Sequence, residues 1–247
     1  FVLENLERTR HTEDYHTQHK ITKQVAAQIY AAASETTSTA IMTFILAMLL
    51  YPDVQRKAQQ ELDSIIGSDR LPDFSDKPSL PYLSAILKEV LRWNPIAPMG
   101  VPHLTTDEDV YEGYHIPKGC TIVANAYAML HDENVFPNPT EFRPERFIKN
   151  GNDLPDPESV ATFGFGRRIC PGSHVALAML YIAAASILTI FDIFPALDEE
   201  GNPIEVAPEF LPASLISEPL PFPCKFTPRQ GKDVESLLKE YLSAEVI

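Results

Sequence analysis

Hydrophobic residues recur at helical spacing along much of the chain, and they predict four helices. The segment 20–51 is rich in alanine and lacks proline and glycine, and its later part is apolar on nearly every side. A helix of this kind belongs in the middle of a large protein. The segment 52–66 has the one-sided pattern of a second, amphipathic helix. Further helices are predicted at 82–93, where an Asn-Pro pair ends the pattern, and at 172–191.

Between the third helix and the fourth, the pattern changes. The segment 95–123 contains short β-prone runs with glycines and a proline between them, and we predict a small sheet there from the runs 109–114 and 121–126. A short helix is predicted at 124–130. The proline-rich stretch 131–163 is predicted to be irregular, and loops of this length usually carry function.

The C-terminal part is also rich in proline. We predict hairpin and loop structure at 195–229 and a short amphipathic helix at 234–242. Together the elements predict a mainly α protein with a small β-sheet. The first long helix begins near the start of the chain, so the sequence offers little before it that would cover its apolar surface.

Composition narrows the possible functions. The formal charge is −14, from 20 Lys and Arg against 34 Asp and Glu. This excess of negative charge repels phosphate, so the sequence argues against a nucleic-acid partner. Hydrophobic residues make up 45% of the chain, which is enough for a buried core.

The three cysteines, Cys120, Cys170 and Cys224, are too few and too scattered for a disulfide framework or a zinc site. A reducing compartment is the simplest inference. Any one of them, taken alone, is interpreted as a small buried hydrophobe.

Two apolar segments were considered as membrane spans, which need about 20 apolar residues. The segment 40–51 is too short, and 175–191 is marginal because Ser186 and Thr189 interrupt it. We interpret the second as a buried core helix. The first 20 residues carry charge throughout and are not a signal peptide, so we expect no membrane anchor in this chain.

The segment 163–172, with the sequence Phe-Gly-Phe-Gly-Arg-Arg-Ile-Cys-Pro-Gly, contains the chemistry that stands out most. Its glycines at 164, 166 and 172 permit tight left-handed turns and the close approach of a flat ligand. A helix is predicted to begin just after Cys170, and the N–H groups at its start favour an anionic sulfur. Such a sulfur suits an iron that already has four porphyrin ligands.

Five positions of this segment, Phe163, Gly166, Arg168, Cys170 and Gly172, resemble the Phe-x-x-Gly-x-Arg-x-Cys-x-Gly haem-binding signature of cytochromes P450. The resemblance implies that Cys170 is the iron ligand. It also implies that the other four residues help to bind haem b, which is iron protoporphyrin IX. The alternative interpretation is a buried cysteine in a glycine-rich turn.

The resemblance covers about residues 20–229 and is strongest to fungal microsomal members of the family. It implies the C-terminal half of the P450 fold, from the oxygen-binding long helix through the haem-binding loop and the helix after it. We therefore expect a partial P450 domain at 1–229 and a C-terminal tail at 230–247. The family's N-terminal half, with its membrane anchor and the roof of the active site, has no counterpart here, so we expect a fragment of a longer chain.

A second part of the resemblance concerns Glu89, Arg92 and Arg146. Glu89 and Arg92 share a helix face, and such a pair is usually a solvated salt bridge. In the P450 family the Glu-x-x-Arg pair is buried and meets an arginine from a Pro-Glu-Arg-Phe segment, which is present here at 144–147. The resemblance implies a structural network that supports the haem loop.

Glu35 and Thr36 lie inside the first predicted helix and resemble the acid and threonine of the P450 oxygen-binding helix. That resemblance implies catalytic roles in delivering protons to dioxygen. Ala33 stands where the family usually has glycine. The alternative is that the threonine hydroxyls only bond to carbonyls one turn earlier.

The remaining site residues are implied by position alone. His103 stands where the family often has a residue that binds a haem propionate, although a lone histidine is usually a surface or core residue. Substrate contacts are implied in three segments: the first helix, the turn after the third helix and a turn at about 213–216. The implied residues are Ala31, Ala32, Ile96, Ala97, Met99, Val101 and Leu215, all small or apolar, which suits a lipophilic substrate.

The resemblance implies a haem-thiolate monooxygenase of secondary metabolism that uses O2 and takes electrons from an NADPH-cytochrome P450 reductase. Arg143, Lys149 and Arg167 could form part of the docking face for that partner. The intact protein would lie at the cytoplasmic face of the endoplasmic reticulum membrane. Two alternatives stay open: an inert fragment, and a peroxygenase or isomerase of the same fold that needs no reductase.

Overall fold

The computed structural model describes residues 1–67, 69–148, 154–211, 215–231, 234–235 and 237. It divides into two compact units, 1–38 and 39–247. The first unit contains helix α1 (Val2–Thr9) and the beginning of helix α2 (Tyr15–Leu50). The sequence did not predict α1, and it placed the start of α2 five residues too late. In α1 the apolar residues Val2, Leu3 and Leu6 do lie on one helix face, but the segment of eight residues is too short for the pattern to stand out.

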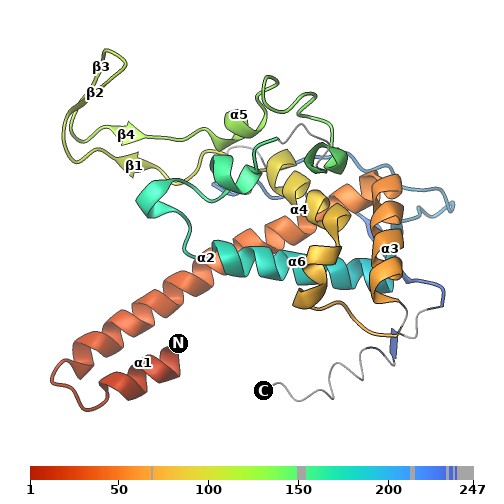
Figure 1. The fold of residues 1–247 in the computed structure, drawn as a ribbon, viewed down its shortest axis with the longest axis horizontal. Helices are drawn as coiled ribbons and strands as arrows, with labels where there is room; N and C mark the ends of the chain where they lie inside the picture. The colour runs from red at the N-terminus through yellow and green to blue at the C-terminus, as the bar shows by residue number, and fades with distance from the viewer. Residues whose placement is uncertain (68, 149–153, 212–214, 232–233, 236, 238–247) are drawn as a thin grey trace. The chain divides into compact units, whose positions relative to one another are not determined.

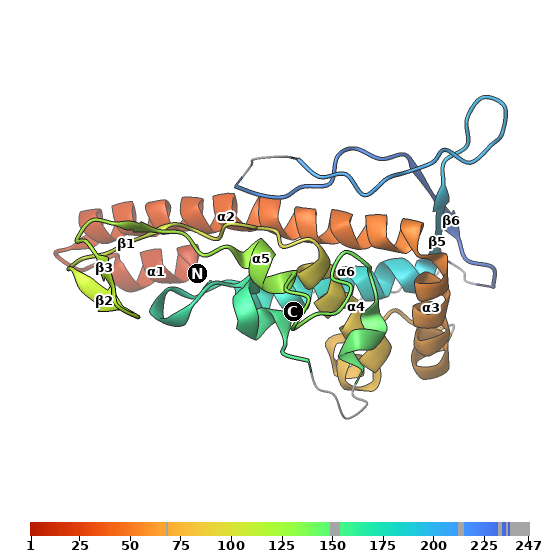
Figure 2. The same ribbon diagram turned by 90° about the horizontal axis from the view of Figure 1, so that it is seen from above.

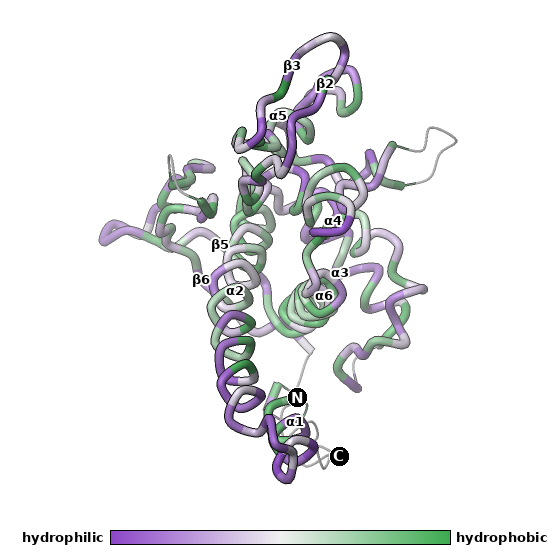
Figure 3. The backbone as a smooth tube through the Cα atoms, turned by 90° about the vertical axis from the view of Figure 1, so that its left-hand side faces the viewer, coloured by the Kyte–Doolittle hydropathy of each residue, from purple (hydrophilic) through white to green (hydrophobic). Residues whose placement is uncertain are grey.

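Burial along α2 changes within the helix. Its residues up to position 35 are mostly exposed, whereas Phe44, Ala47 and Met48 are fully buried. Figure 3 shows the same change as a passage from hydrophilic to hydrophobic residues along α2. The sequence placed this helix in the middle of a large protein because its later part is apolar on nearly every side. That part joins the main core cluster from Ala40 onwards, whereas the earlier part of α2 is mostly exposed.

The main core of the second unit lies among α2, α3 (Pro52–Ile66), α4 (Pro81–Trp93) and α6 (Ser173–Ile190) (Figure 1). Its fully buried side chains include Leu62, Leu80, Leu83, Ile86, Leu180 and Tyr181. These residues recur at helical spacing, so the apolar faces predicted from the sequence are the faces by which the helices pack against one another. Burying such a side chain contributes about 1.5–3 kcal/mol to folding.

The start of α4 is fixed by a carboxylate from α3. Glu61 accepts hydrogen bonds from the backbone N–H groups of Tyr82 and Leu83 at 2.8 and 2.9 Å. These N–H groups have no partner inside their own helix, so Glu61 acts as a cap supplied by another element. Before α4, the 3-10 helix η1 (Phe74–Ser79) starts at Asp73 with a capping box, which the sequence analysis did not predict.

Helix α6 is rich in hydrophobic residues along its whole length (Figure 3). By length and composition, both α2 and α6 could cross a membrane. However, α6 buries Leu180, Tyr181 and Leu188 in the protein core, which favours its interpretation as a core helix. It ends one residue before its predicted limit because Phe191 begins strand β5.

Three separate two-stranded antiparallel ladders make up the β-structure of the described residues. Strand β1 (His103–Leu104) pairs with β4 (Thr121–Ile122), and β2 (Asp109–Tyr111) pairs with β3 (Tyr114–Ile116). The run predicted at 109–114 is confirmed as strand β2 at 109–111, but Glu112 and Gly113, which both have positive φ, then turn the chain into β3. In Figure 1 the β2–β3 hairpin lies beyond the β1–β4 ladder.

The strand predicted at 121–126 ends early, because Asn125 caps helix α5 (Ala126–Leu130). Its Oδ1 accepts a hydrogen bond from Ala128 N at 2.9 Å. Leu130 then packs with Phe136 and Ala161 in a second, smaller core cluster. The predicted helix at 124–130 is confirmed with a start two residues later.

The third ladder joins β5 (Phe191–Pro195) to β6 (Cys224–Pro228), beside α3 (Figure 2). Gln55 of α3 is buried and pairs with β5 as a strand would: its Oε1 accepts from Ile193 N at 2.7 Å and its Nε2 donates to Ile193 O at 3.0 Å. The hairpin and loop structure was predicted to begin at residue 195. The first strand of this ladder begins earlier, at Phe191, which was predicted to be the last residue of the helix. The helix predicted at 234–242 falls largely outside the described residues.

Candidate functional site

The segment around Cys170 is a tight loop held by its own backbone. It follows the short π-helical turn η3 (Glu158–Thr162) and includes the 3-10 turn η4 (Gly166–Arg168). The backbone N–H of Cys170 donates to the carbonyl oxygen of Phe163 at 2.8 Å, which closes the loop across seven residues. Phe163 is half-buried against the main core, while the Cys170 side chain is exposed. The interpretation of Cys170 as a buried small hydrophobe is therefore wrong.

Two of the three glycines in the loop have the conformation that the sequence predicted. Gly164 and Gly166 have φ values of 79° and 55°, a region that other residues enter only with strain. Gly172 does not, since its φ is −90°. A Cβ at position 172 would lie 3.8 Å from Cys170 Sγ, an ordinary van der Waals distance, so Gly172 borders the thiol without being required by space.

The surroundings of the thiol fit a flat, lipophilic iron cofactor. Phe165 and Ile169 on the loop, and Val175 and Met179 on α6, are exposed apolar side chains. The described residues contain no group of three or more His, Cys, Asp and Glu side chains that could hold a bare metal ion. A single exposed sulfur beside apolar side chains suits a metal whose other ligands come from a macrocycle.

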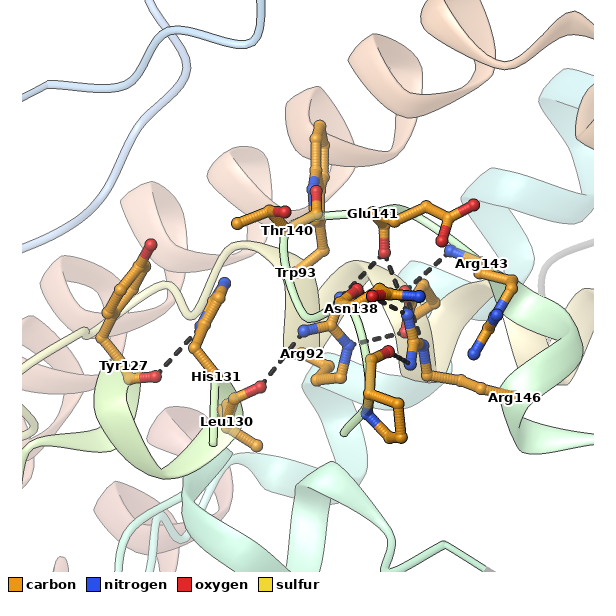
Figure 4. A network of polar contacts seen from close by, with 12 residues as sticks. Arg92, Trp93, Tyr127, Leu130, His131, Asn138, Thr140, Glu141, Arg143 and Arg146 are labelled. Carbon is orange, nitrogen blue, oxygen red and sulfur yellow. Dashed lines mark hydrogen bonds and ion pairs between the residues drawn. The ribbon is translucent and has the colours of Figure 1, made fainter. Parts of the chain in front are cut away.

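Glu89, Arg92 and Arg146 come together in a buried network (Figure 4). Glu89 and Arg92 lie one turn apart on α4, and both side chains have no exposed area. Arg92 donates to both carboxylate oxygens of Glu89, at 2.8 and 2.9 Å. Arg146 of η2 (Pro144–Phe147) donates its Nε–H to Glu89 Oε1 at 3.1 Å. The solvated-pair interpretation is thus wrong.

Backbone carbonyl groups of Leu130, at the end of α5, and of the stretch 131–163 complete this network. Arg146 donates to the carbonyl oxygens of Pro137, Asn138 and Glu141, and Arg92 donates to those of Leu130 and Glu141. Two guanidiniums are therefore satisfied by one carboxylate and a set of carbonyls, most of them shown in Figure 4. The sequence signal was the run of prolines, which marks a rigid loop but does not reveal which carbonyls turn inward.

Burial affects the ionisation of groups in and beside the network. It lowers the pKa of Arg146 even though Glu89 opposes the shift, and Arg92 adds to it by repulsion. An arginine keeps its charge nevertheless. Burial also lowers the pKa of His131, whose ring stacks on Tyr127 at 3.9 Å and whose Nδ1 lies 3.0 Å from the Tyr127 carbonyl oxygen.

Helix α4 also contacts the segment that leads into the cysteine loop. Lys88 pairs with Asp156 at 2.8 Å, two residues before the turn η3 begins. At the start of η3, burial and repulsion from Asp156 raise the pKa of Glu158. One face of α4 thus contacts the network through Glu89 and Arg92, and the loop segment through Lys88.

Glu35 and Thr36 lie on α2 in the first compact unit, whereas the cysteine loop belongs to the second. The Glu35 side chain is exposed. Thr36 Oγ1 donates to the carbonyl oxygen of Ala32 at 2.7 Å, which is the back-bond that the sequence allowed as an alternative. Ala31 and Ala32 are exposed on the same stretch of helix.

Of the residues expected by position, His103 is exposed on β1, where it pairs with Ile122. Ile96 and Ala97 are half-buried, whereas Met99, Val101 and Leu215 are exposed. Arg143 is half-buried, and its backbone N–H donates to Glu89 Oε1 at 2.8 Å, which draws it towards the network. Lys149 and Ala213 lie outside the described residues.

Comparison with known proteins gives one consistent family. A family model described as cytochrome P450 matches residues 1–222. The cytochrome P450 monooxygenase ple1 of Rhodocybe pseudopiperita is 51% identical over 221 residues, which are 88% of this chain and 42% of that protein. A cytochrome P450 monooxygenase of Armillaria gallica is 48% identical over 240 residues, 97% of this chain and 47% of that protein. The chain therefore spans less than half the length of these relatives.

Proposed function

Because this chain belongs to the cytochrome P450 family, we propose that it binds haem b through the Cys170 thiolate and serves a monooxygenase reaction. One atom of dioxygen enters a lipophilic organic substrate and the other is reduced to water. The electrons come from NADPH through a cytochrome P450 reductase, and the intact protein works at the cytoplasmic face of the endoplasmic reticulum membrane. The haem, when bound, supplies the activation of dioxygen.

The observation that carries this proposal is the exposed thiol of Cys170, in a loop whose conformation is fixed by hydrogen bonds and ion pairs. A hydrogen bond from Cys170 N to Phe163 O closes the loop. The ion pair between Lys88 and Asp156 ties the segment before the loop to α4. The buried Glu89 network holds the proline-rich stretch before it. A metal ligand needs this kind of support, since small displacements of a ligand weaken metal binding and change its electronics.

The other loop residues have more limited roles in the proposal. Gly172 borders the sulfur, and Gly164 and Gly166 allow the backbone to turn sharply under the cofactor. Arg168 is exposed two residues before Cys170 and offers positive charge to a haem propionate, and the exposed His103 on β1 offers a ring N–H.

Glu35 and Thr36 provide the proton route in the proposal. The exposed Glu35 carboxylate exchanges protons with water. Thr36 Oγ1 donates to Ala32 O and still has lone pairs that accept a hydrogen bond. A hydroxyl that donates and accepts at once can hold a proton donor in place.

The absorption spectrum of the reduced, carbon monoxide-bound protein tests the iron ligand. Haem is added to the purified chain, and we expect the strongly red-shifted Soret band of thiolate-ligated haem. Cys224→Ala is the matched control and should keep the band, whereas Cys170→Ala should lose it. A shifted band in the Cys170→Ala protein would overturn the assignment.

A second measurement separates the monooxygenase from a peroxygenase of the same fold. Turnover of a lipophilic test substrate is compared with NADPH and reductase and with hydrogen peroxide alone. The proposal expects turnover with reductase and a loss of it in Glu35→Gln. Equal turnover with peroxide in wild type and Glu35→Gln would favour the peroxygenase, because peroxide already carries the protons and electrons needed.

A further inference from the structure

Asn94, at the C-terminal end of α4, joins segments that are far apart in the sequence. It is 4% exposed. Its Nδ2 donates to Thr43 Oγ1 on α2 at 3.1 Å and to the Ser217 carbonyl oxygen at 2.8 Å. Its Oδ1 accepts from Ser217 Oγ at 2.6 Å. Both polar atoms of this buried amide are therefore paired, which is the condition under which a buried polar group is tolerated.

Ser217 is held at every polar atom it has. Its carbonyl and hydroxyl groups bind Asn94, and its backbone N–H donates to the carbonyl oxygen of Ile96 at 2.8 Å. These two partners of Ser217, Asn94 and Ile96, lie on either side of Pro95 in the chain. The turn after α4 and the loop around Ser217 are thus joined edge to edge, as two short strands would be.

The same loop is anchored a second time, at its base. The Phe210 ring meets the Trp93 ring edge-on at a centroid distance of 5.7 Å. The backbone N–H of Leu211 donates to the Glu218 carbonyl oxygen at 2.8 Å, so the two arms of the loop pair with each other. Trp93 fixes the base of the loop by packing, and its neighbour Asn94 fixes the returning arm by hydrogen bonds.

We propose that Asn94 is a positioning residue, which fixes the loop at Ser217 against the turn 95–100 and so sets the shape of the apolar substrate pocket. We name Asn94, Thr43 and Ser217 the Asn94 clamp. Leu215 is exposed two residues before Ser217, and Ile96 adjoins the clamp from the other side. A change in the clamp therefore moves Leu215 relative to Ile96. The statement about the pocket rests on the proposed function, whereas the clamp rests on the contacts alone.

The chemistry of the clamp is specific to asparagine. Aspartate has no N–H to donate to Thr43 or to the Ser217 carbonyl, and a buried carboxylate facing that carbonyl would be repelled. Glutamine carries the same amide on a longer stem, which does not fit a site with 4% exposure. The conservative substitution lies on the other side of the contact, since Ser217→Thr keeps the hydroxyl that Ser217→Ala removes.

Hydrogen exchange measured by mass spectrometry tests the clamp in the 247-residue chain. In Asn94→Ala we expect the backbone amides of 215–218 to exchange about tenfold faster, as one lost buried hydrogen bond would cause. Gln59→Ala is the matched control: Gln59 is a buried amide on α3 that donates to Phe191 O and Asp192 Oδ1. That variant should speed exchange near β5 and leave 215–218 as in wild type. Unchanged or uniformly faster exchange in Asn94→Ala would overturn the clamp.

Two azoles test the pocket in the haem-loaded protein, because both bind iron through nitrogen but differ in bulk. For Asn94→Ala we expect the Kd of 1-phenylimidazole to rise about tenfold while that of imidazole stays within about twofold. Ser217→Ala should change in the same direction and Ser217→Thr should resemble wild type. Equal changes for both azoles would overturn the positioning role. If wild type takes up no haem, the proposed function fails, and the exchange result still decides whether Asn94 holds the loop.

Discussion

Glu89 and Arg92 face each other across one turn of α4 through two parallel hydrogen bonds, and neither side chain has any exposed area. Arg146 reaches the same carboxylate from a position 57 residues later in the chain. Three charged side chains are therefore buried together, and removing the carboxylate leaves two buried guanidiniums without a counter-charge.

Removal of the Glu89 carboxylate should destabilise the chain strongly. In Glu89→Ala, Arg92 and Arg146 remain buried side by side, and we expect the free energy of unfolding in urea to fall by about 3–5 kcal/mol. The matched control is Asp53→Ala, which removes the partner of Arg56 from an exposed pair with the same spacing on α3. That change should cost far less, because water solvates the remaining charge.

A similar loss in the two variants would contradict a structural role for the network. Glu89→Gln provides a second comparison if the alanine variant does not fold, because it keeps the shape of the side chain and removes only its charge. We expect its loss to lie between the two.

Asp76 should make the stability of the chain fall in acid. The Arg70 guanidinium binds this carboxyl at 2.6 and 2.7 Å and, with the backbone N–H of Asp73, holds its pKa below the ordinary value against the opposing effect of burial. The folded state therefore favours the carboxylate. The resulting stabilisation is complete above the unfolded-state pKa of about 3.9 and is lost as the pH falls through the lower folded-state pKa.

Urea unfolding of wild type and Asp76→Asn between pH 2 and 7 measures this effect. Wild type should be the more stable protein at pH 7, and the difference should shrink below about pH 4 as Asp76 takes up a proton. A difference that grows in acid would show that the sign of the pKa shift is wrong.

Replacement of Gln55 should lower the free energy of unfolding more than replacement of its exposed neighbours on α3. Its amide pairs with both backbone groups of Ile193, so Gln55→Ala leaves a buried N–H and a buried carbonyl without that partner. We expect a loss of about 1–3 kcal/mol in the free energy of unfolding. Gln60→Ala, on the exposed face of α3, is the control and should change little. Equal losses would mean that the buried amide does not hold β5.

Cys170 and Cys224 should differ in their reaction with iodoacetamide. Burial raises the pKa of the Cys224 thiol, which lowers the fraction of reactive thiolate there, whereas Cys170 is exposed. Without haem, mass spectrometry should find Cys170 modified first. Haem should then protect Cys170 and leave the rate at Cys224 unchanged. Haem uptake without protection of Cys170 would contradict its role as the ligand.

The local pattern of residues predicted much of this protein. The spacing of apolar side chains placed α3, α4 and α6 within one or two residues, because a helix face is set by residues three and four apart. The sequence also identified the cysteine loop, since its glycines and its cysteine lie within ten residues of each other. It identified β-structure at 109–114, but it did not divide that run into strand β2 and a turn at Glu112 and Gly113.

Contacts between distant segments could not be predicted in this way. The spacing of Glu89 and Arg92 put them on one face, but whether that face meets water or the carbonyls of 131–163 depends on how the chain packs. The same holds for Asn94, which the sequence marked only as the end of a helix. Near neighbours in the chain were enough to specify α3, α4, α6, the cysteine loop and the family resemblance. Which polar groups are buried together was settled by the packing of distant segments, because burial depends on every segment that surrounds a site.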